Sequence, residues 1–256
     1  MIDLKDLTFL IPFRYDSFDR LNNLNLVLNY LKCNFICNIL VGEEYSVNPT
    51  CTDLPKGCQW YGYTTKSEYF QKCKTMNNLF KESNTKYICL YDSDVFLPKL
   101  QYLDAYNLLN GDVDIVLPYD GTVYNIPRSD YIKILDACLD PKLFLKIDNS
   151  KYKTRRKNSI GGAIFFKSNT FRSGGMANEN FKSWGAEDDE LFYRFAKLEY
   201  KMRRVNGPMY HLDHFRSTNG RIRNPNYKNN MNEYNRIRDM SSEQLKLEIQ
   251  NWTWIK

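Results

Sequence analysis

Residues 87–94 read YICLYDSD, a run of five apolar or aromatic residues that ends in two aspartates separated by a serine. Such a short run is typical of a buried β-strand. In open α/β sheets, ligands bind beyond the carboxyl ends of the strands, which is where this prediction places Asp92, Ser93 and Asp94. Their two carboxylates offer the hard oxygen ligands that Mg²⁺ or Mn²⁺ prefers. The alternative is a turn with two solvated aspartates.

A second Asp-x-Asp triplet, Asp112-Val113-Asp114, precedes the apolar run 115–117 instead of following one. These aspartates therefore lie at the amino end of their predicted strand, away from the expected ligand-binding edge. We select Asp92 and Asp94 as site residues on this ground.

The flanking sequence indicates an α/β fold with one main domain. An apolar run at 7–11, closed by Pro12, precedes leucines at helical spacing from 21 to 31, with a helix cap at Asp16 or Ser17. A second apolar run at 35–41 completes the opening of a parallel sheet. The remaining expected elements are strands at 115–117 and 160–166, helices at 70–82, 129–138, 187–198 and from 241, and loops at 45–64, 148–158 and 216–230.

Composition narrows the class of protein. With 256 residues of which 43% are hydrophobic, the chain can bury a large core and is not a disordered segment. The net charge of +6 comes from basic residues with acids among them, which argues against a nucleic-acid binder and is compatible with an anionic ligand.

The cysteines and the N-terminal sequence indicate a protein of the cytoplasm. Seven cysteines without zinc-site spacing are typical of reduced thiols in a cytosolic protein. The acidic start at 1–6 does not resemble a signal peptide, and no apolar run reaches the ~18 residues that cross a bilayer. We expect a cytoplasmic protein that associates with a membrane at most peripherally, at its inner face.

Three further patterns carry chemistry. His211 and His214, the only histidines, are three residues apart and could converge on one metal, or they could be ordinary hydrogen-bonded histidines. The run 184–190, WGAEDDE, places four acids at a predicted helix start; the helix dipole accounts for one or two of them, and one carboxylate could act as a general base. Trp184 could form a wall against a sugar ring or belong to the core. Arg14, after the first strand, could pair with a diphosphate or lie on the surface.

Taken in order, these pieces resemble the β-1,4-galactosyltransferase family and its bacterial relatives, including chondroitin-polymerase-type transferases. The similar segments are IPFR at 11–14, FQKCKTMN at 70–77, DSD at 92–94, the glycine pair Gly161-Gly162, WGAEDD at 184–189, and the two histidines. Lys72 stands where that family has Arg. The resemblance spans about residues 7–230.

The resemblance implies a GT-A fold over about 1–240, with a nucleotide-binding half at about 1–120, an acceptor and catalytic half at about 121–240, and a C-terminal helical extension at 241–256. It implies inverting transfer with Asp188 as the base and a metal, Mn²⁺ or Mg²⁺, held by Asp94, His211 and His214. Glu187 is implied as a second catalytic residue, which positions the acceptor together with Trp184, and Asp189 is implied as an acceptor contact. Asp92 would contact the ribose or support the metal from behind its ligands. The remaining implied roles are a donor-sugar contact at Gly161 and Gly162 and nucleotide contacts by Pro12, Phe13, Arg14, Phe70, Lys72 and Ser93.

The functional hypothesis is a soluble microbial transferase, bacterial or viral, that moves a hexose or N-acetylhexosamine, with Gal or GalNAc favoured, from a UDP-sugar to a glycan or lipid-linked glycan. Polysaccharide or glycoconjugate synthesis would be its setting, and residues 216–230 could close as a lid. One alternative is a non-catalytic UDP-sugar- or carbohydrate-binding module. Another is a metal-dependent phosphohydrolase or nucleotidyltransferase, although the chain lacks a glycine-rich phosphate loop.

Overall fold

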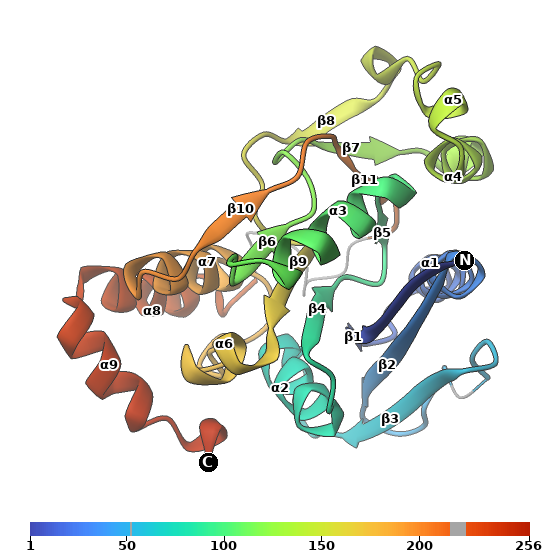
Figure 1. Cartoon of the computed structure of the whole chain (residues 1–256). Coiled ribbons are helices and arrows are strands. Elements are labelled where there is room, and N and C mark those ends of the chain that lie inside the picture. The colour runs from blue at the N-terminus through green and yellow to red at the C-terminus, as the bar shows by residue number, and fades with distance from the viewer. Residues whose placement is uncertain (52, 216–223) are drawn as a thin grey trace.

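Two β-sheets form the framework of the molecule (Figure 1). The computed structural model describes residues 1–51, 53–215 and 224–256. A seven-stranded sheet has the order β10-β6-β9-β4-β1-β2-β3, and a four-stranded sheet has the order β5-β11-β7-β8. The strands of the described chain are β1 (Ile2–Phe13), β2 (Phe35–Tyr45), β3 (Cys58–Thr64), β4 (Tyr87–Tyr91), β5 (Val95–Phe96), β6 (Ile115–Leu117), β7 (Val123–Ile126), β8 (Lys153–Arg156), β9 (Ala163–Lys167), β10 (Met202–Arg204) and β11 (Met209–Leu212).

The seven-stranded sheet is mostly parallel. The pairs β1–β2, β1–β4, β2–β3 and β6–β10 are parallel, and only β9 runs antiparallel to its neighbours β4 and β6. This arrangement, with helices flanking the sheet, confirms the predicted α/β fold class. The helices are α1 (Phe18–Asn34), α2 (Lys72–Glu82), α3 (Lys99–Asn110), α4 (Tyr131–Leu139), α5 (Pro141–Phe144), α6 (Ser168–Ser173), α7 (Glu187–Lys197), α8 (Tyr227–Asp239) and α9 (Ser242–Gln250), with short 3-10 turns at Arg128–Asp130, Asn149–Lys151 and Thr253–Ile255.

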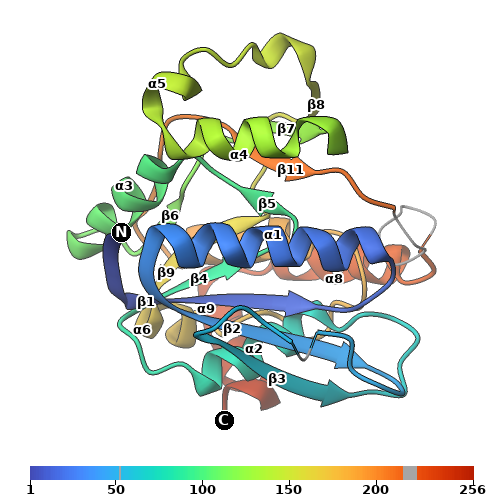
Figure 2. The ribbon, with the colours of Figure 1, turned by 90° about the vertical axis from the view of Figure 1, so that its right-hand side faces the viewer.

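Helices cover both faces of this sheet because alternate strand residues point to opposite sides. Phe9 and Ile11 of β1 pack with α1 and α3 in one apolar cluster. Leu10, between them, packs with α2, α6 and α7 in the other. Figure 2 shows α1 lying along the sheet on one side and α2 on the other. Both faces of the central strands are buried, which explains why they read as continuous apolar runs in the sequence.

The structure corrects several sequence-based boundaries. The predicted loop 45–64 contains β3, an edge strand whose residues are only partly buried and therefore lack a clear apolar run. The basic segment 148–158, predicted as a loop, contains β8. The strand expected at 160–166 begins at Ala163, after the two glycines.

Four helices were missed, the short α5 and α6 and the longer α3 and α8. Helix α3 has no strong apolar periodicity, and α8 begins at Tyr227, inside the predicted loop 216–230. Residues 216–223 of that loop lie outside the described residues. Helix α8 is rich in asparagine, a weak helix former, and it is stabilised by packing against α7 instead.

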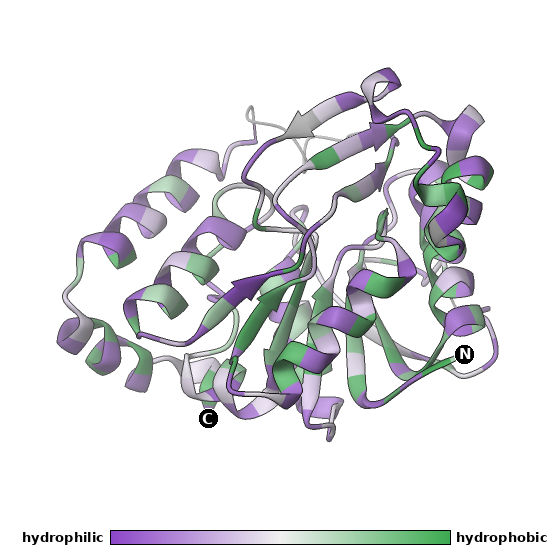
Figure 3. Cartoon of the chain, turned by 45° about the horizontal axis from the view of Figure 1, so that its top comes forward, coloured by the Kyte–Doolittle hydropathy of each residue, from purple (hydrophilic) through white to green (hydrophobic). Residues whose placement is uncertain are grey.

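Apolar residues are concentrated in the strands of the large sheet and on the inner faces of the helices (Figure 3). Within the described residues, no helix combines the length and apolar character needed to cross a membrane. All seven cysteines are free thiols, as the sequence indicated.

Candidate active site

The second sheet brings the aspartate turn and the histidines together. Strand β4 ends at Tyr91, and the following turn is held by a hydrogen bond of 2.8 Å from the Asp92 amide to the Gly162 carbonyl oxygen. The chain then enters β5, which pairs antiparallel with β11 so that Val95 lies opposite His211. The Leu212 amide also donates to the Asp94 carbonyl oxygen over 2.8 Å. The strand register, and not sequence proximity, therefore places both histidines beside Asp94.

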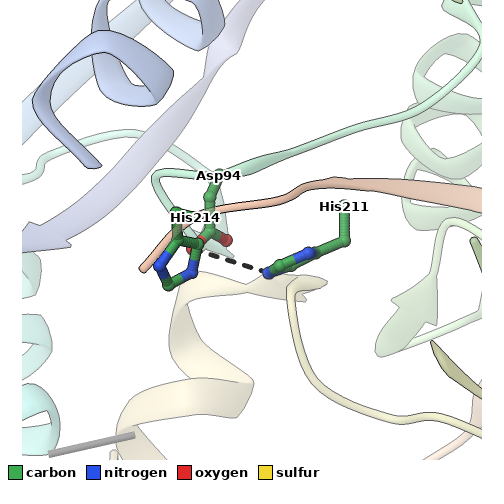
Figure 4. Close-up of side chains that lie close together, drawn as sticks. All are labelled: Asp94, His211 and His214. Atoms are coloured by element: carbon green, nitrogen blue, oxygen red, sulfur yellow. Dashed lines mark ion pairs between the residues drawn. The ribbon is translucent and has the colours of Figure 1, made fainter. Parts of the chain in front are cut away.

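Asp94, His211 and His214 form a compact group (Figure 4). Oδ2 of Asp94 lies 3.0 Å from Nε2 of His214 and 3.7 Å from Nε2 of His211. The three potential ligand atoms lie within 4.8 Å of one another, so this group could hold a metal ion. One carboxylate oxygen and two imidazole nitrogens suit a first-row divalent cation such as Mn²⁺.

Hydrogen bonds orient both imidazoles toward this point. Nδ1 of His211 lies 2.8 Å from Oδ1 of Asn125, which is its register partner on β7. Nδ1 of His214 lies 2.6 Å from the Phe215 carbonyl oxygen. Because both partners are acceptors, each Nδ1 donates to its partner, and Nε2 is the nitrogen of each ring that faces Asp94, where a metal would replace the contact between His214 and the carboxylate. This tautomer pattern supports the metal-ligand interpretation of the two histidines.

Arg20, at the start of α1, adds a positive charge beside this group. Its guanidinium lies 3.8 Å from Oδ2 of Asp94 and 3.5 Å from Nε2 of His214. Burial alone would favour the neutral form of Asp94. His211, the hydrogen bond with His214 and the Arg20 charge outweigh burial, and together they hold the pKa of Asp94 well below its usual value. The carboxylate is therefore ionised and available as a ligand.

Lys72, on the first turn of α2, lies among three carboxylates. Its Nζ is 2.9 Å from Asp92, 3.6 Å from Asp188 and 3.9 Å from Glu187. Burial of Lys72 would lower its pKa, but the three acids raise that pKa well above its usual value. Burial and repulsion from Asp188 raise the pKa of Glu187 to about 7, although Lys72 opposes the shift. Burial, together with repulsion from Asp94 and Asp188, raises the pKa of Asp92 despite the adjacent ammonium.

These groups open into a cleft. A smaller adjoining pocket shares Lys72, Asp92 and Glu187 with the cleft and is also lined by Asp188. The described residues that line the larger cleft are Pro12, Arg14, Tyr15, Asp16, Arg20, Phe70, Lys72, Asp92, Ser93, Asp94, Ser183, Trp184, Glu187, His211 and His214.

The glycine pair is tightly packed against this site. A Cβ atom added to Gly161 would lie 1.9 Å from Oδ2 of Asp188, so no other residue fits there without displacing that carboxylate. Gly162 has φ +93°, and a Cβ there would lie 2.5 Å from the Met209 side chain. Gly161 is therefore in close contact with Asp188, whereas the contact of the two glycines with a donor sugar stays a prediction.

Trp184 stands at the mouth of the cleft. Its side chain is 38% exposed, and its ring stacks on Tyr227 at a centroid distance of 5.7 Å. The loop behind it turns through positive φ angles at Ser183, Gly185 and Ala186, immediately before α7 begins at Glu187. An exposed aromatic face beside buried carboxylates is suited to contact with a sugar ring.

Three predicted site residues, Phe13, Arg14 and Asp189, do not have the open position in the cleft that their predicted roles suggest. The Phe13 side chain is 1% exposed and belongs to the core, because it points away from its strand neighbours Pro12 and Arg14. The predicted nucleotide contact of Phe13 is therefore not one that its buried side chain makes. Arg14 lines the cleft, but its guanidinium already contacts Glu44 at 2.6 Å and the Ser67 carbonyl oxygen at 2.9 Å. Among the described residues, Asp189 lines neither cavity.

Sequence reasoning missed Arg20 and Asn125. Arg20 lies in the first turn of the helix that follows β1, at the sheet edge where ligands bind, so its position was a usable signal. Asn125 had no such signal, because its role depends on the register between β7 and β11. The rejected aspartates lie elsewhere: Asp112 pairs with Lys201 at 2.9 Å, and Asp114 with Lys167 at 3.5 Å.

The chain has limited similarity to solved structures. The catalytic domain of Drosophila β1,4-galactosyltransferase 7 in complex with xylobiose aligns at 16% identity and a TM-score of 0.47, over 80% of this chain and 65% of that chain. A mutant of the same enzyme in complex with manganese, UDP-Gal and xylobiose aligns at 15% identity with the same TM-score and the same coverage. This chain therefore spans slightly less than two thirds of the length of those chains. No curated protein matches the sequence.

A family model supports the predicted resemblance. The model described as the N-terminal domain of galactosyltransferase matches residues 141–218. That segment contains Gly161, the WGAEDD run and both histidines, whereas Asp94 and Lys72 lie before it. Over residues 141–218 the chain is therefore similar to galactosyltransferases.

Proposed function

We propose that this protein is a metal-dependent glycosyltransferase that moves a sugar from a nucleotide-sugar donor to an acceptor hydroxyl with inversion. The proposal rests on one observation: the cleft with Asp94, His211 and His214 adjoins a smaller pocket with Asp188, and Lys72 contacts Asp92, Glu187 and Asp188 between them. The galactosyltransferase match over 141–218 supports it, because that segment supplies both histidines and both helix acids. The sequence resemblance favours UDP-Gal or UDP-GalNAc as donor and a glycan as acceptor.

In this proposal, one group of residues activates the acceptor and another stabilises the leaving diphosphate. Asp188 accepts the proton of the acceptor hydroxyl, whose oxygen forms the new bond to the anomeric carbon while the bond to the diphosphate oxygen breaks. A divalent metal at Asp94, His211 and His214 would supply charge that stabilises the departing diphosphate. Arg20 contributes a second positive charge on that side. Glu187 and Trp184 border the space that the acceptor would enter.

The test is transfer from a panel of UDP-sugars to oligosaccharide acceptors, with Mn²⁺, with Mg²⁺ and with EDTA. We expect transfer only with metal. Asp188→Asn should lower turnover by roughly 10²–10⁴ while UDP binding stays near normal. Asp112→Asn, which removes an exposed carboxylate from the other Asp-x-Asp triplet, is the matched control and should leave turnover unchanged.

Three results would contradict the proposal. Binding of UDP-sugars without turnover would favour a non-catalytic module. Release of sugar phosphate without transfer would favour phosphoryl chemistry. Full activity in EDTA would show that Asp94, His211 and His214 do not hold a metal that the reaction needs.

A further inference from the structure

The positive charge of the chain is concentrated in one segment. Residues 128–157 contain nine Lys or Arg and four Asp, a net charge of +5 out of +6 for the whole chain. This segment forms α4, α5 and β8, which project together from the body of the molecule (Figures 1 and 2). The overall composition, with basic residues apparently scattered among acids, does not reveal this concentration.

The same segment exposes large apolar side chains. Ile132 is 64% exposed, Leu143 42% and Leu145 85%, and Leu139 at the end of α4 is 37% exposed. The two sides of α4 have different surroundings. Ile134 is fully buried in the core, whereas Ile132 faces the solvent. Exposed apolar residues that occur singly need no explanation, but four lie close in sequence on the packed helices α4 and α5 and on the residue that follows α5, which indicates an apolar patch.

Exposed lysines surround these apolar residues. Lys133 lies beside Ile132, and Lys142 and Lys146 flank the two exposed leucines of the α5 region. Three of the four acids have local partners: Asp130 accepts from Tyr152, Asp140 from the Lys142 amide and Asp148 from Ser150. The remaining exposed lysines of the segment are Lys151, Lys153 and Lys157.

We propose that this α4–α5 surface docks on an anionic lipid bilayer. Apolar side chains with a rim of lysines match an interface in which leucines enter the acyl boundary and ammonium groups meet phosphate headgroups. A soluble polyanion would pair with the lysines but leave the leucines in water, so the combination favours a lipid surface. The inference does not depend on the proposed transfer reaction, because the surface contains none of the residues that line the cleft.

The experiment is co-sedimentation of the full chain with vesicles, which needs no sugar substrate. Vesicles of phosphatidylcholine alone are compared with vesicles that also contain phosphatidylglycerol, at low and at high salt. We expect binding to the anionic vesicles at least about tenfold stronger than to the neutral ones, since each lysine near an anionic surface contributes about fivefold. Binding should weaken as salt screens the headgroups.

Two matched variants locate the surface. Leu145→Ser/Lys146→Glu should weaken binding to anionic vesicles at least about tenfold. Leu247→Ser/Lys246→Glu makes the same changes on α9, where Leu247 is 61% exposed, and should bind like the unchanged protein. Circular-dichroism melts confirm that both variants fold. The proposal is overturned by equal binding to neutral and anionic vesicles, by no binding, or by the two variants behaving alike. A different outcome would assign the surface to a second copy of this chain: the protein self-associates and does not bind vesicles, and only Leu145→Ser/Lys146→Glu abolishes the self-association.

Discussion

Lys72 connects the two chemical halves of the cleft at the scale of single residues. Its ammonium contacts Asp92 on the metal side and Asp188 and Glu187 on the helix side. Without Lys72, three neighbouring carboxylates would repel one another in a partly buried space. This repulsion would favour protonation of the carboxyl groups. We infer that Lys72 is a positioning residue that holds the proposed base, Asp188, in place.

Lys72→Met should therefore change the pH dependence of transfer. Lys72 lowers the pKa values of Glu187 and Asp92, so removing its positive charge raises both pKa values, and these carboxyl groups around the base then ionise only at a higher pH. We expect the acidic limb of the kcat/KM profile to move to higher pH, with Lys72→Arg restoring most of the original profile. An acidic limb at the same pH in Lys72→Met would show that the ammonium does not act on the base.

Residues near strand ends were the ones that the sequence could identify. Asp92 and Asp94 follow an obvious apolar strand, and Asp188 lies at a predicted helix start, so local patterns located them. The contacts of Lys72 were not predictable, because they join residues 72, 92 and 188 through the folding of β4 and α7 onto α2. Arg14 shows the converse: the pattern marked it, but Glu44 and Ser67 already engage its guanidinium.

At the scale of elements, β11 organises the proposed metal site. It pairs with β5 on one side and with β7 on the other, and the two registers set Val95 and Asn125 on either side of His211. The imidazole is thus oriented by a neighbouring strand before any metal arrives. Such partners of ligating histidines commonly affect metal affinity by 10–100-fold.

Asn125→Ala should accordingly weaken Mn²⁺ binding by roughly 10–100-fold with little effect on the fold. Titration calorimetry, or the electron paramagnetic resonance signal of free Mn²⁺, measures this without any turnover. Asn29→Ala, on the exposed side of α1, is the control and should bind the metal normally. Unchanged Mn²⁺ affinity in Asn125→Ala would argue against His211 as a ligand in this tautomer.

The helices and strands that are well buried could be predicted from their apolar sequence patterns. Strands 87–91 and 115–117 were found with their observed bounds, and the capping box at Ser241 marked α9. The edge strand β3 and the asparagine-rich α8 were not found, because their stability comes from pairing and packing with distant segments. The second sheet had no sequence signal, since β5 and β11 are short and pair across more than a hundred residues.

At the scale of the whole molecule, the C-terminal segment is integrated into the fold near α7. Trp252 is 4% exposed and lies over the buried Arg194 guanidinium at 5.0 Å. Trp254 donates its indole N–H to the Gly175 carbonyl oxygen at 3.1 Å. Arg194 also bonds to Glu190 within α7, so the helix that begins with the proposed catalytic acids packs against this segment through Arg194.

Trp252→Ala should lower the free energy of unfolding by about 3–5 kcal/mol, the usual cost of truncating a buried aromatic residue. Urea unfolding measures the change. Trp184→Ala removes the same kind of side chain from a half-exposed position and should cost much less stability. Equal losses in the two variants would show that the C-terminal segment adds little to the folded core.

The cluster of acids around Lys72 and Arg20 also has a kinetic consequence. Asp92, Asp94, Glu187 and Asp188 form ion pairs with two cations, Lys72 and Arg20, while Arg14 in the same cleft pairs with Glu44. These acids therefore leave a net negative charge in the site even with Glu187 half-protonated near pH 7. A nucleotide diphosphate is itself an anion and would be repelled. We therefore expect a compulsory order of addition, in which a divalent cation enters first and the nucleotide follows.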